Sequence, residues 1–334
     1  YIHRKGIIMG NSKRKLNIAA VLCVIFAITT IAGIAASLII LKNRHFYSDE
    51  RLASIKQSAS KDTINKIENR LAQGETMVSI LRDIDPDKMV YVSGGTYVFA
   101  NINHSLKMNT FSNGTFAKDS NNQITYSENG KVVSHKVIDV SKYQTSIDFA
   151  KVKNAGVEYA MVRCGYRSYG SGILTEDTSF NNYAAEALKN NIKIGAYFFS
   201  QAINVEEAKE EAEYVLNMIK PYQISGPVAI DVEEIFDDTY RQMHLSASQL
   251  TDVIITFCDR IKEAGYTPMI YSNLSSFIGN IELDRLENYE KWLAYYSDEP
   301  YFPYEMSMWQ YTDSGSIDGI TGNVDLNISF KEWN

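Results

Sequence analysis

The sequence predicts an α/β fold in which residues 136–334 form an irregular (β/α) barrel of the TIM type. Strand patterns and helical patterns alternate through this region, which favours a parallel sheet with helices on its outer face. The number of strand patterns matches what a closed barrel requires. The helical patterns shorten towards the C-terminus, so the final third of the barrel is expected to be irregular.

The predicted strands alternate with amphipathic helices until the last three strands, which are closely spaced. The strand patterns cover residues 137–140, 159–163, 193–200, 227–233, 268–273, 291–296, 307–312 and 323–328. The helical patterns cover residues 147–154, 180–190, 205–219 and 246–264.

Near the N-terminus, residues 16–41 form an apolar run of about 26 residues without a charge, which predicts a single transmembrane helix. Lysine and arginine slightly favour the N-terminal side, which predicts a cytoplasmic tail over residues 1–15. A cleaved signal peptide ending near Ala36 is the alternative, but the apolar run continues past that point. The predicted location is the cell membrane, as a single-pass protein with the barrel on the outer side.

Between the apolar run and the barrel, two further regions are predicted. Residues 46–88 have apolar positions at helical spacing and predict a helical stalk, with weak self-association as one option. Asp85-Pro86-Asp87 ends that helix. Residues 89–135 contain alternating apolar runs and turn pairs such as Asn129-Gly130, which predict a small antiparallel β unit. This unit either binds a polymer or separates the barrel from the membrane, and the second role is favoured.

The composition excludes several classes of function. A net charge of −7 argues against nucleic acid as the main partner, because phosphate binding needs a concentrated basic face. Three cysteines provide no disulfide framework, and no two of the five histidines are close enough in sequence to suggest a zinc site. A hydrolase that depends on zinc or on a Cys-His pair is therefore not expected.

Two carboxyl groups end the apolar strand over residues 227–233. Asp231 and Glu233 are two residues apart, so both are expected on one face of the strand, with Val232 on the other. Barrel enzymes carry their catalytic groups at such strand ends. Neighbouring carboxyl groups raise each other's pKa, so one can stay protonated and act as a general acid. A single acid there would more often be a cap or an ion-pair partner.

The first and last strands carry acids at corresponding places, Asp139 and Asp325. The two strands are neighbours in a closed barrel, so these carboxyl groups are expected to adjoin. Because burying one unpaired carboxyl group is costly, four that converge on one mouth indicate a site rather than packing.

Aromatic residues near the strand ends are candidates for a wall on which sugar rings stack. Most individual tyrosines in strands are expected to belong to the core. The predicted substrate contacts are Tyr197, Tyr271, Trp292, Tyr296, Trp309 and Asn327.

At these residues the sequence resembles the lysozymes of glycoside hydrolase family 25, over about residues 136–334. The resemblance rests on six motifs in the same order: Asp139–Gln144, Gly195–Phe199, Ala229–Glu233, Trp292–Tyr296, Trp309–Thr312 and Val324–Asn327. It implies an irregular β/α barrel with Glu233 as general acid and with Asp139, Asp231 and Asp325 completing the acidic site. Phe198 departs from the pattern, since many relatives have histidine there.

The resemblance also implies an activity, namely cleavage of the β-1,4 bond between N-acetylmuramic acid and N-acetylglucosamine in peptidoglycan. It implies no cofactor and a monomeric catalytic domain. Retention through a covalent intermediate, inversion, and assistance by the 2-acetamido group of the substrate all fit the residues, and the last is slightly favoured. The alternatives are a non-catalytic wall-binding barrel and a chitinase-like glycosidase.

Overall fold

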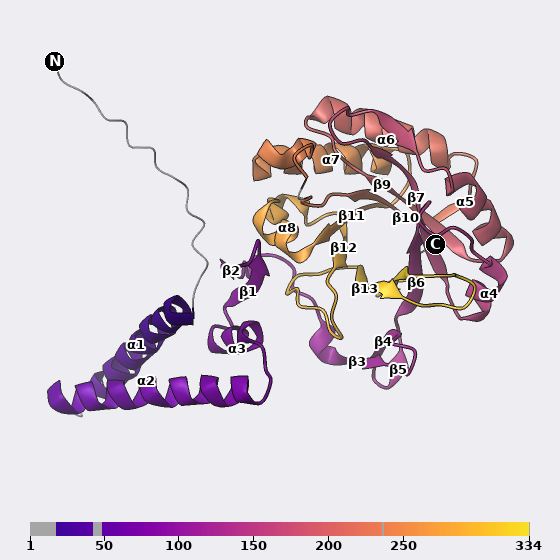
Figure 1. The fold of residues 1–334 in the computed structure, drawn as a ribbon. Coiled ribbons are helices and arrows are strands. Elements are labelled where there is room, and N and C mark those ends of the chain that lie inside the picture. The colour runs from indigo at the N-terminus through magenta and orange to yellow at the C-terminus, as the bar shows by residue number, and fades with distance from the viewer. Residues whose placement is uncertain (1–17, 43–48, 236, 334) are drawn as a thin grey trace, which may run out of the picture. The chain divides into compact units, whose positions relative to one another are not determined.

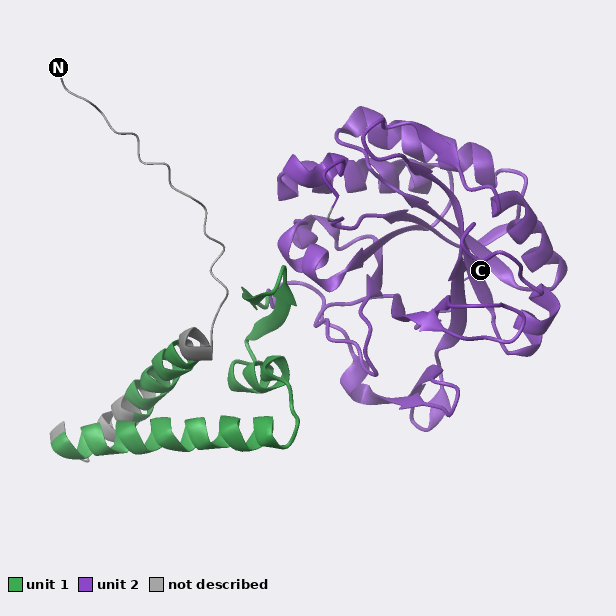
Figure 2. Cartoon of the chain, in the orientation of Figure 1, with its two compact units in different colours: residues 1–102 green, residues 103–334 purple. Residues whose placement is uncertain are grey.

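The structure is a computed structural model that describes residues 18–42, 49–235 and 237–333 (Figure 1). The chain divides into two compact units, residues 1–102 and residues 103–334 (Figure 2). The predicted cytoplasmic tail over residues 1–15 lies outside the described residues.

The described residues of the first unit form three helices and a two-stranded antiparallel sheet. Its elements are α1 (Ile18–Lys42), α2 (Asp49–Ala72), α3 (Met77–Ile84), β1 (Lys88–Ser93) and β2 (Thr96–Asn101). Its buried core is a small apolar cluster to which α1, α2, α3 and β1 contribute: Ile25, Ile67, Ile80, Leu81 and Val90.

The predicted stalk over residues 46–88 is divided into the two helices α2 and α3. The chain turns at Gly74, whose φ of +88° is a conformation that favours glycine. Thr76 then begins α3 as its N-cap, since its side chain accepts a hydrogen bond from the backbone of Ser79 at 3.2 Å. The region predicted as a helical stalk therefore consists of two helices that are separated at Gly74.

Within the part of the chain that the structure describes, no helix is long and apolar enough to cross a membrane. The prediction of a transmembrane helix over residues 16–41 is not confirmed.

The second unit is built on a barrel of eight strands. The strands are β6 (His135–Val140), β7 (Tyr159–Arg167), β9 (Lys193–Phe199), β10 (Ile224–Asp231), β11 (Pro268–Asn273), β12 (Glu290–Ala294), β13 (Met308–Gly315) and β14 (Val324–Ser329). The helices, which Figure 1 shows around the outside, are α4 (Phe149–Asn154), α5 (Phe180–Lys189), α6 (Val205–Ile219), α7 (Ala247–Glu263) and α8 (Leu274–Gly279). A short strand, β8 (Leu174–Glu176), pairs with β7 outside the barrel.

The barrel closes where β6 pairs with both β7 and β14. Strands β6 to β13 pair in parallel in their spatial order, whereas β14 is antiparallel to both β13 and β6. The described residues 295–307, between β12 and β13, contain no helix. The predicted barrel with an irregular final third is therefore confirmed.

The interior of the barrel is filled by apolar and aromatic side chains from alternate strand positions, which leaves the opposite faces for the helices. This buried set is Val137, Tyr159, Met161, Tyr197, Ala229, Met269, Tyr271, Trp292, Ala294, Met308 and Trp333.

A second small antiparallel sheet packs on the barrel in place of a helix. Its strands are β3 (Gly114–Lys118), β4 (Ile124–Glu128) and β5 (Lys131–Val132). Phe116 of β3 packs edge-on against Trp309 of β13, with ring centroids 5.5 Å apart. Because β1 and β2 pack with α3 while this sheet packs on the barrel, the predicted β unit over residues 89–135 is divided between the two units.

Candidate active site

The site is a cavity of about 590 Å³ at the mouth of the barrel, towards the C-terminal ends of its parallel strands. It is lined by all four predicted acids and four of the predicted aromatic residues: Asp139, Asp231, Glu233, Asp325, Tyr197, Tyr271, Trp292 and Tyr296. The structure therefore brings together eight of the ten predicted site residues.

Asp139 and Asp325 lie side by side where the barrel closes, as register partners on β6 and β14. Asp139 Oδ2 accepts hydrogen bonds from Asn327 Nδ2 at 2.8 Å and from Gln310 Nε2 at 3.0 Å. Burial raises the pKa of both carboxyl groups, and the charge of Asp139 helps to raise the pKa of Asp325 to about 10. Because the amide donors favour a charged Asp139, we assign Asp139 as the ionised member and Asp325 as the protonated one.

Asp231 and Glu233 share the cavity face of one extended segment, and Val232 between them is buried. The segment is fixed to β11, since Val232 N–H donates to Tyr271 O at 3.1 Å and Ser272 Oγ donates to Val232 O at 2.5 Å. Burial raises the pKa of Glu233, partly offset by a hydrogen bond with Tyr271. Burial, and then the charge of Glu233, raise the pKa of Asp231 well above its usual value. Both carboxyl groups therefore hold a proton more readily than an ordinary Asp or Glu side chain does.

Asp231 also has an unused hydrogen-bonding atom. Its Oδ1 is buried and has no hydrogen-bond partner among the described residues. Buried oxygens are nearly always hydrogen-bonded, so this one is available to a donor that enters the cavity.

Gln310 was not predicted as a site residue, yet it connects the acids to the aromatic wall. Its Oε1 accepts hydrogen bonds from the hydroxyls of Tyr271 at 2.9 Å and Tyr296 at 3.0 Å, while its Nε2 donates to Asp139. The side chain is almost fully buried, so its orientation is fixed by these three partners. Gln310 therefore holds two cavity tyrosines and one carboxylate in a single network.

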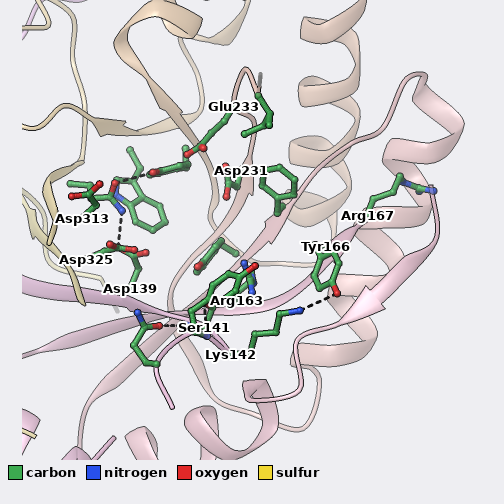
Figure 3. Close-up of a pocket in the computed structure, with 18 of the residues that line it drawn as sticks. Asp139, Ser141, Lys142, Arg163, Tyr166, Arg167, Asp231, Glu233, Asp313 and Asp325 are labelled. Carbon is green, nitrogen blue, oxygen red and sulfur yellow. Dashed lines mark hydrogen bonds between the residues drawn. The ribbon is translucent and has the colours of Figure 1, made fainter. Parts of the chain in front are cut away.

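A basic and aromatic group on β7 and on the segment that follows β6 was also missed. Arg163 Nε donates to the fully buried Asp177 at 2.8 Å, and the Arg163 guanidinium lies 5.0 Å from the centre of the Tyr143 ring. Figure 3 shows Lys142 and Tyr166 on the opposite side of the cavity from Asp325. Arg163 ends an apolar strand pattern, which is the same signal that identified Asp231.

Trp309 does not line the cavity, so the prediction that it stacks on substrate is wrong. On β13 Gln310 points into the barrel, and strand alternation turns Trp309 to the outside. There its ring packs on Phe116, and its Nε1 donates to Tyr295 O at 2.7 Å. Trp309 is a core residue between the barrel and the β3–β5 sheet.

Asn327 lies behind the cavity wall rather than in it. Its amide is fully used, because Nδ2 donates to Asp139 and Oδ1 accepts from Trp292 Nε1 at 2.7 Å. It is fully buried and does not line the cavity. The prediction that Asn327 contacts substrate is therefore replaced by a role in orienting Asp139 and Trp292.

The contrast between Trp309 and Tyr296 gives a direct test of this placement. Trp309→Leu should lower the free energy of unfolding by about 2 kcal/mol, because a packed ring and a buried hydrogen bond are lost. Tyr296, which is 53% exposed at the cavity, should behave in the opposite way: Tyr296→Leu raises KM with little loss of stability. Urea unfolding and steady-state kinetics of both variants would measure this. A higher KM for Trp309→Leu at unchanged stability would contradict the placement.

The arrangement suits acid-catalysed cleavage of a sugar polymer. It presents an acid whose pKa is raised, a second carboxyl group with a free oxygen, and aromatic surfaces along the same cavity. Among the described residues, no group of three or more His, Cys, Asp and Glu side chains is arranged to hold a metal ion.

Comparison with known proteins agrees with the fold and the motifs. The autolytic lysozyme of Clostridium acetobutylicum is 28% identical over 192 residues, which cover 57% of this chain and 54% of that relative. The chain therefore spans about half the length of this curated relative.

Two solved structures share the fold. The modular autolysin LytC from Streptococcus pneumoniae has 22% identity and a TM-score of 0.52, covering 73% of this chain and 61% of that chain. A family 25 glycosyl hydrolase from Bacillus anthracis has 20% identity and a TM-score of 0.51, covering 59% of this chain and 89% of that chain.

The family model of the glycosyl hydrolases of family 25 matches residues 138–320, which is more than half of the chain and extends from within β6 to beyond β13. With the closed barrel and the acidic mouth, this match shows that the chain belongs to glycosyl hydrolase family 25 and carries a glycoside hydrolase domain.

Proposed function

We propose that this chain is a peptidoglycan hydrolase that cleaves the β-1,4 bond between N-acetylmuramic acid and N-acetylglucosamine, with Glu233 as general acid. The observation that carries the proposal is the pair Asp231 and Glu233 in the cavity, where burial raises both pKa values. Two comparisons support the substrate: one relative is named an autolytic lysozyme, and LytC has been solved in complex with a synthetic peptidoglycan ligand.

The proposed reaction starts when Glu233 gives its proton to the glycosidic oxygen as the bond from that oxygen to C1 breaks. The carbonyl oxygen of the substrate's 2-acetamido group bonds to C1 and forms an oxazolinium ion. Asp231, whose Oδ1 has no partner within the described residues, accepts the acetamido N–H and stabilises that ion. Glu233 then takes a proton from water, whose oxygen bonds to C1 and opens the ring with net retention.

The activity can be tested with the purified full chain and purified peptidoglycan. We expect loss of turbidity together with new reducing ends that are muramic acid. Reducing N-acetylglucosamine ends would contradict the proposed bond, and binding without any cleavage would indicate a wall-binding barrel. Cleavage of chitin but not of peptidoglycan would indicate a chitinase-like enzyme.

We also propose that residues 16–41 anchor the chain in the cell membrane, with the hydrolase on the outer side and acting as a monomer. The support is the uncharged apolar run and the small excess of basic residues before it. Protease treatment of intact spheroplasts should digest the barrel and leave the chain's N-terminal fragment with the membranes. Full-length protein found only in the culture medium would contradict the anchor.

A further inference from the structure

Lys142 is a cation at the cavity that has no acidic partner in the described part of the chain. Three cationic side chains line the cavity: Lys142, Arg163 and Arg167. Arg163 pairs with Asp177 at 2.8 Å, and Arg167 pairs with Glu211 at 2.7 Å. The charge of each arginine is therefore balanced by an acidic side chain of the protein, whereas the charge of Lys142 is available to a bound molecule.

Lys142 lies in a partly buried pocket whose walls include two tyrosine rings. Its Nζ donates to Tyr166 Oη at 3.2 Å and lies 4.7 Å from the centre of the Tyr166 ring. Tyr143, which is 73% exposed, provides a second ring, whose centre lies 5.8 Å from Lys142 Nζ. A lysine has three donors, and Tyr166 takes only one of them.

The backbone that presents Lys142 is held firmly. Its N–H donates to the buried Asp177 Oδ2 at 3.1 Å, the same oxygen that accepts from Arg163. One residue earlier, Ser141 N–H donates to Gln144 Oε1 at 2.9 Å, and Gln144 O accepts from the Tyr183 hydroxyl. Lys142 is therefore pre-organised, which reduces the entropy lost when it binds a ligand.

The charge balance of the cavity indicates what Lys142 binds. Burial raises the pKa of Asp231, Glu233 and Asp325, which favours their neutral forms and weakens the repulsion of an anion by the acidic wall. An anionic ligand can therefore enter. Figure 3 shows Lys142 and Tyr166 on the opposite side of the cavity from Asp313 and Asp325, so a ligand that spans the cavity meets acids at one side and a cation at the other.

We propose that Lys142 binds a carboxylate of the substrate and so selects glycan strands with muramic acid over neutral glycans. This inference rests on the proposed function. Muramic acid differs from N-acetylglucosamine by a lactyl ether, which carries a free carboxylate when unsubstituted and a peptide stem with its own carboxylates otherwise. The lactyl ether and the peptide stem both offer a carboxylate to the Lys142 ammonium. A charge-assisted hydrogen bond in a partly buried pocket is strong enough to favour strands with muramic acid over neutral glycans.

The test compares three forms of one substrate: glycan strands with peptide stems, strands stripped of stems so that the lactyl carboxylate is free, and stripped strands with that carboxyl converted to a methylamide. For the full chain we expect kcat/KM on the carboxylate-bearing strands to exceed that on the methylamide strands by about tenfold. Lys142→Met should bring this ratio close to one, and Lys142→Arg should keep most of it. If Lys142→Met loses its preference over methylamide strands only for stripped strands, Lys142 binds the lactyl carboxylate. If it loses that preference only for strands with stems, Lys142 binds a stem carboxylate.

Lys262→Met, which removes an exposed lysine on α7 away from the cavity, serves as the matched control and should keep the full ratio. If Lys142→Met keeps both ratios while the unaltered chain clears peptidoglycan, the inference on Lys142 is overturned and the muramidase proposal stands. If the unaltered chain cleaves none of the three substrates, the proposed function itself fails.

Discussion

Replacing Glu233 by glutamine is expected to lower kcat on peptidoglycan by about 10²–10⁴-fold, which is the usual contribution of a general acid. Glutamine keeps the size and polarity of the side chain but has no acidic proton to give. KM should change little, because the variant still fills the same place beside Tyr271. Release of reducing ends under saturating substrate, followed over hours for the variant, would measure the loss.

Glu234→Gln is the matched control for Glu233→Gln. Glu234 is the next residue, is exposed, and does not line the cavity, so its loss should leave kcat within about twofold. The pH profile gives a second check. Glu233 donates only while protonated, and burial raises its pKa, so kcat/KM should fall as pH rises through a value above that of an ordinary glutamate. Equal clearing by Glu233→Gln and the unaltered chain would rule out Glu233 as the proton donor.

Asp231→Asn should separate activity from stability. The activity should fall by about 10²-fold or more, because a pre-organised group that stabilises the transition state is removed. The stability should change in the opposite direction. Burial raises the pKa of Asp231 in the folded state, so the folded protein holds this proton where the unfolded chain has released it. Asp231 therefore lowers stability as pH rises above its unfolded pKa of about 3.9, and the asparagine variant escapes that loss.

Melting temperatures between pH 4 and pH 8 would measure this difference. Asp231→Asn should have a smaller decline in Tm with rising pH than the unaltered chain, and Asp284→Asn, at an exposed aspartate, should follow the unaltered chain. A variant that loses activity but keeps the original pH dependence of Tm would show that the pKa of Asp231 is not raised in the folded protein.

The barrel and its acids could be predicted because the relevant signals are local. Period-two alternation puts Asp231 and Glu233 on one face, and β-α alternation predicts the barrel that makes Asp139 a neighbour of Asp325. Both deductions need only short sequence windows and one rule about closure. The four acids that line the cavity follow almost directly from them.

Other features depend on contacts that no short window contains. Trp309 and Gln310 are adjacent on one strand, and which of them faces inward is decided by the pairing of β13 with β12 and β14. Hydrophobicity alone favoured Trp309 as the residue that faces the cavity. In the structure Gln310 faces it, because Gln310 donates a hydrogen bond to the buried Asp139. The Arg163–Asp177 pair likewise joins two segments whose proximity appears only in the folded chain.

Closure of the barrel by β6 and β14 has a consequence for how the protein is made. The ribosome delivers β14 after every other strand of the barrel, so β6 waits for this partner until the rest of the barrel has been synthesised. Asp139 therefore meets Asp325 and Asn327 only after synthesis of the last strand. Such long-range pairing forms slowly because a large loop must close first. The site of the hydrolase is thus completed only once β14 has been synthesised, and a chain shortened before β14 is left without a working site.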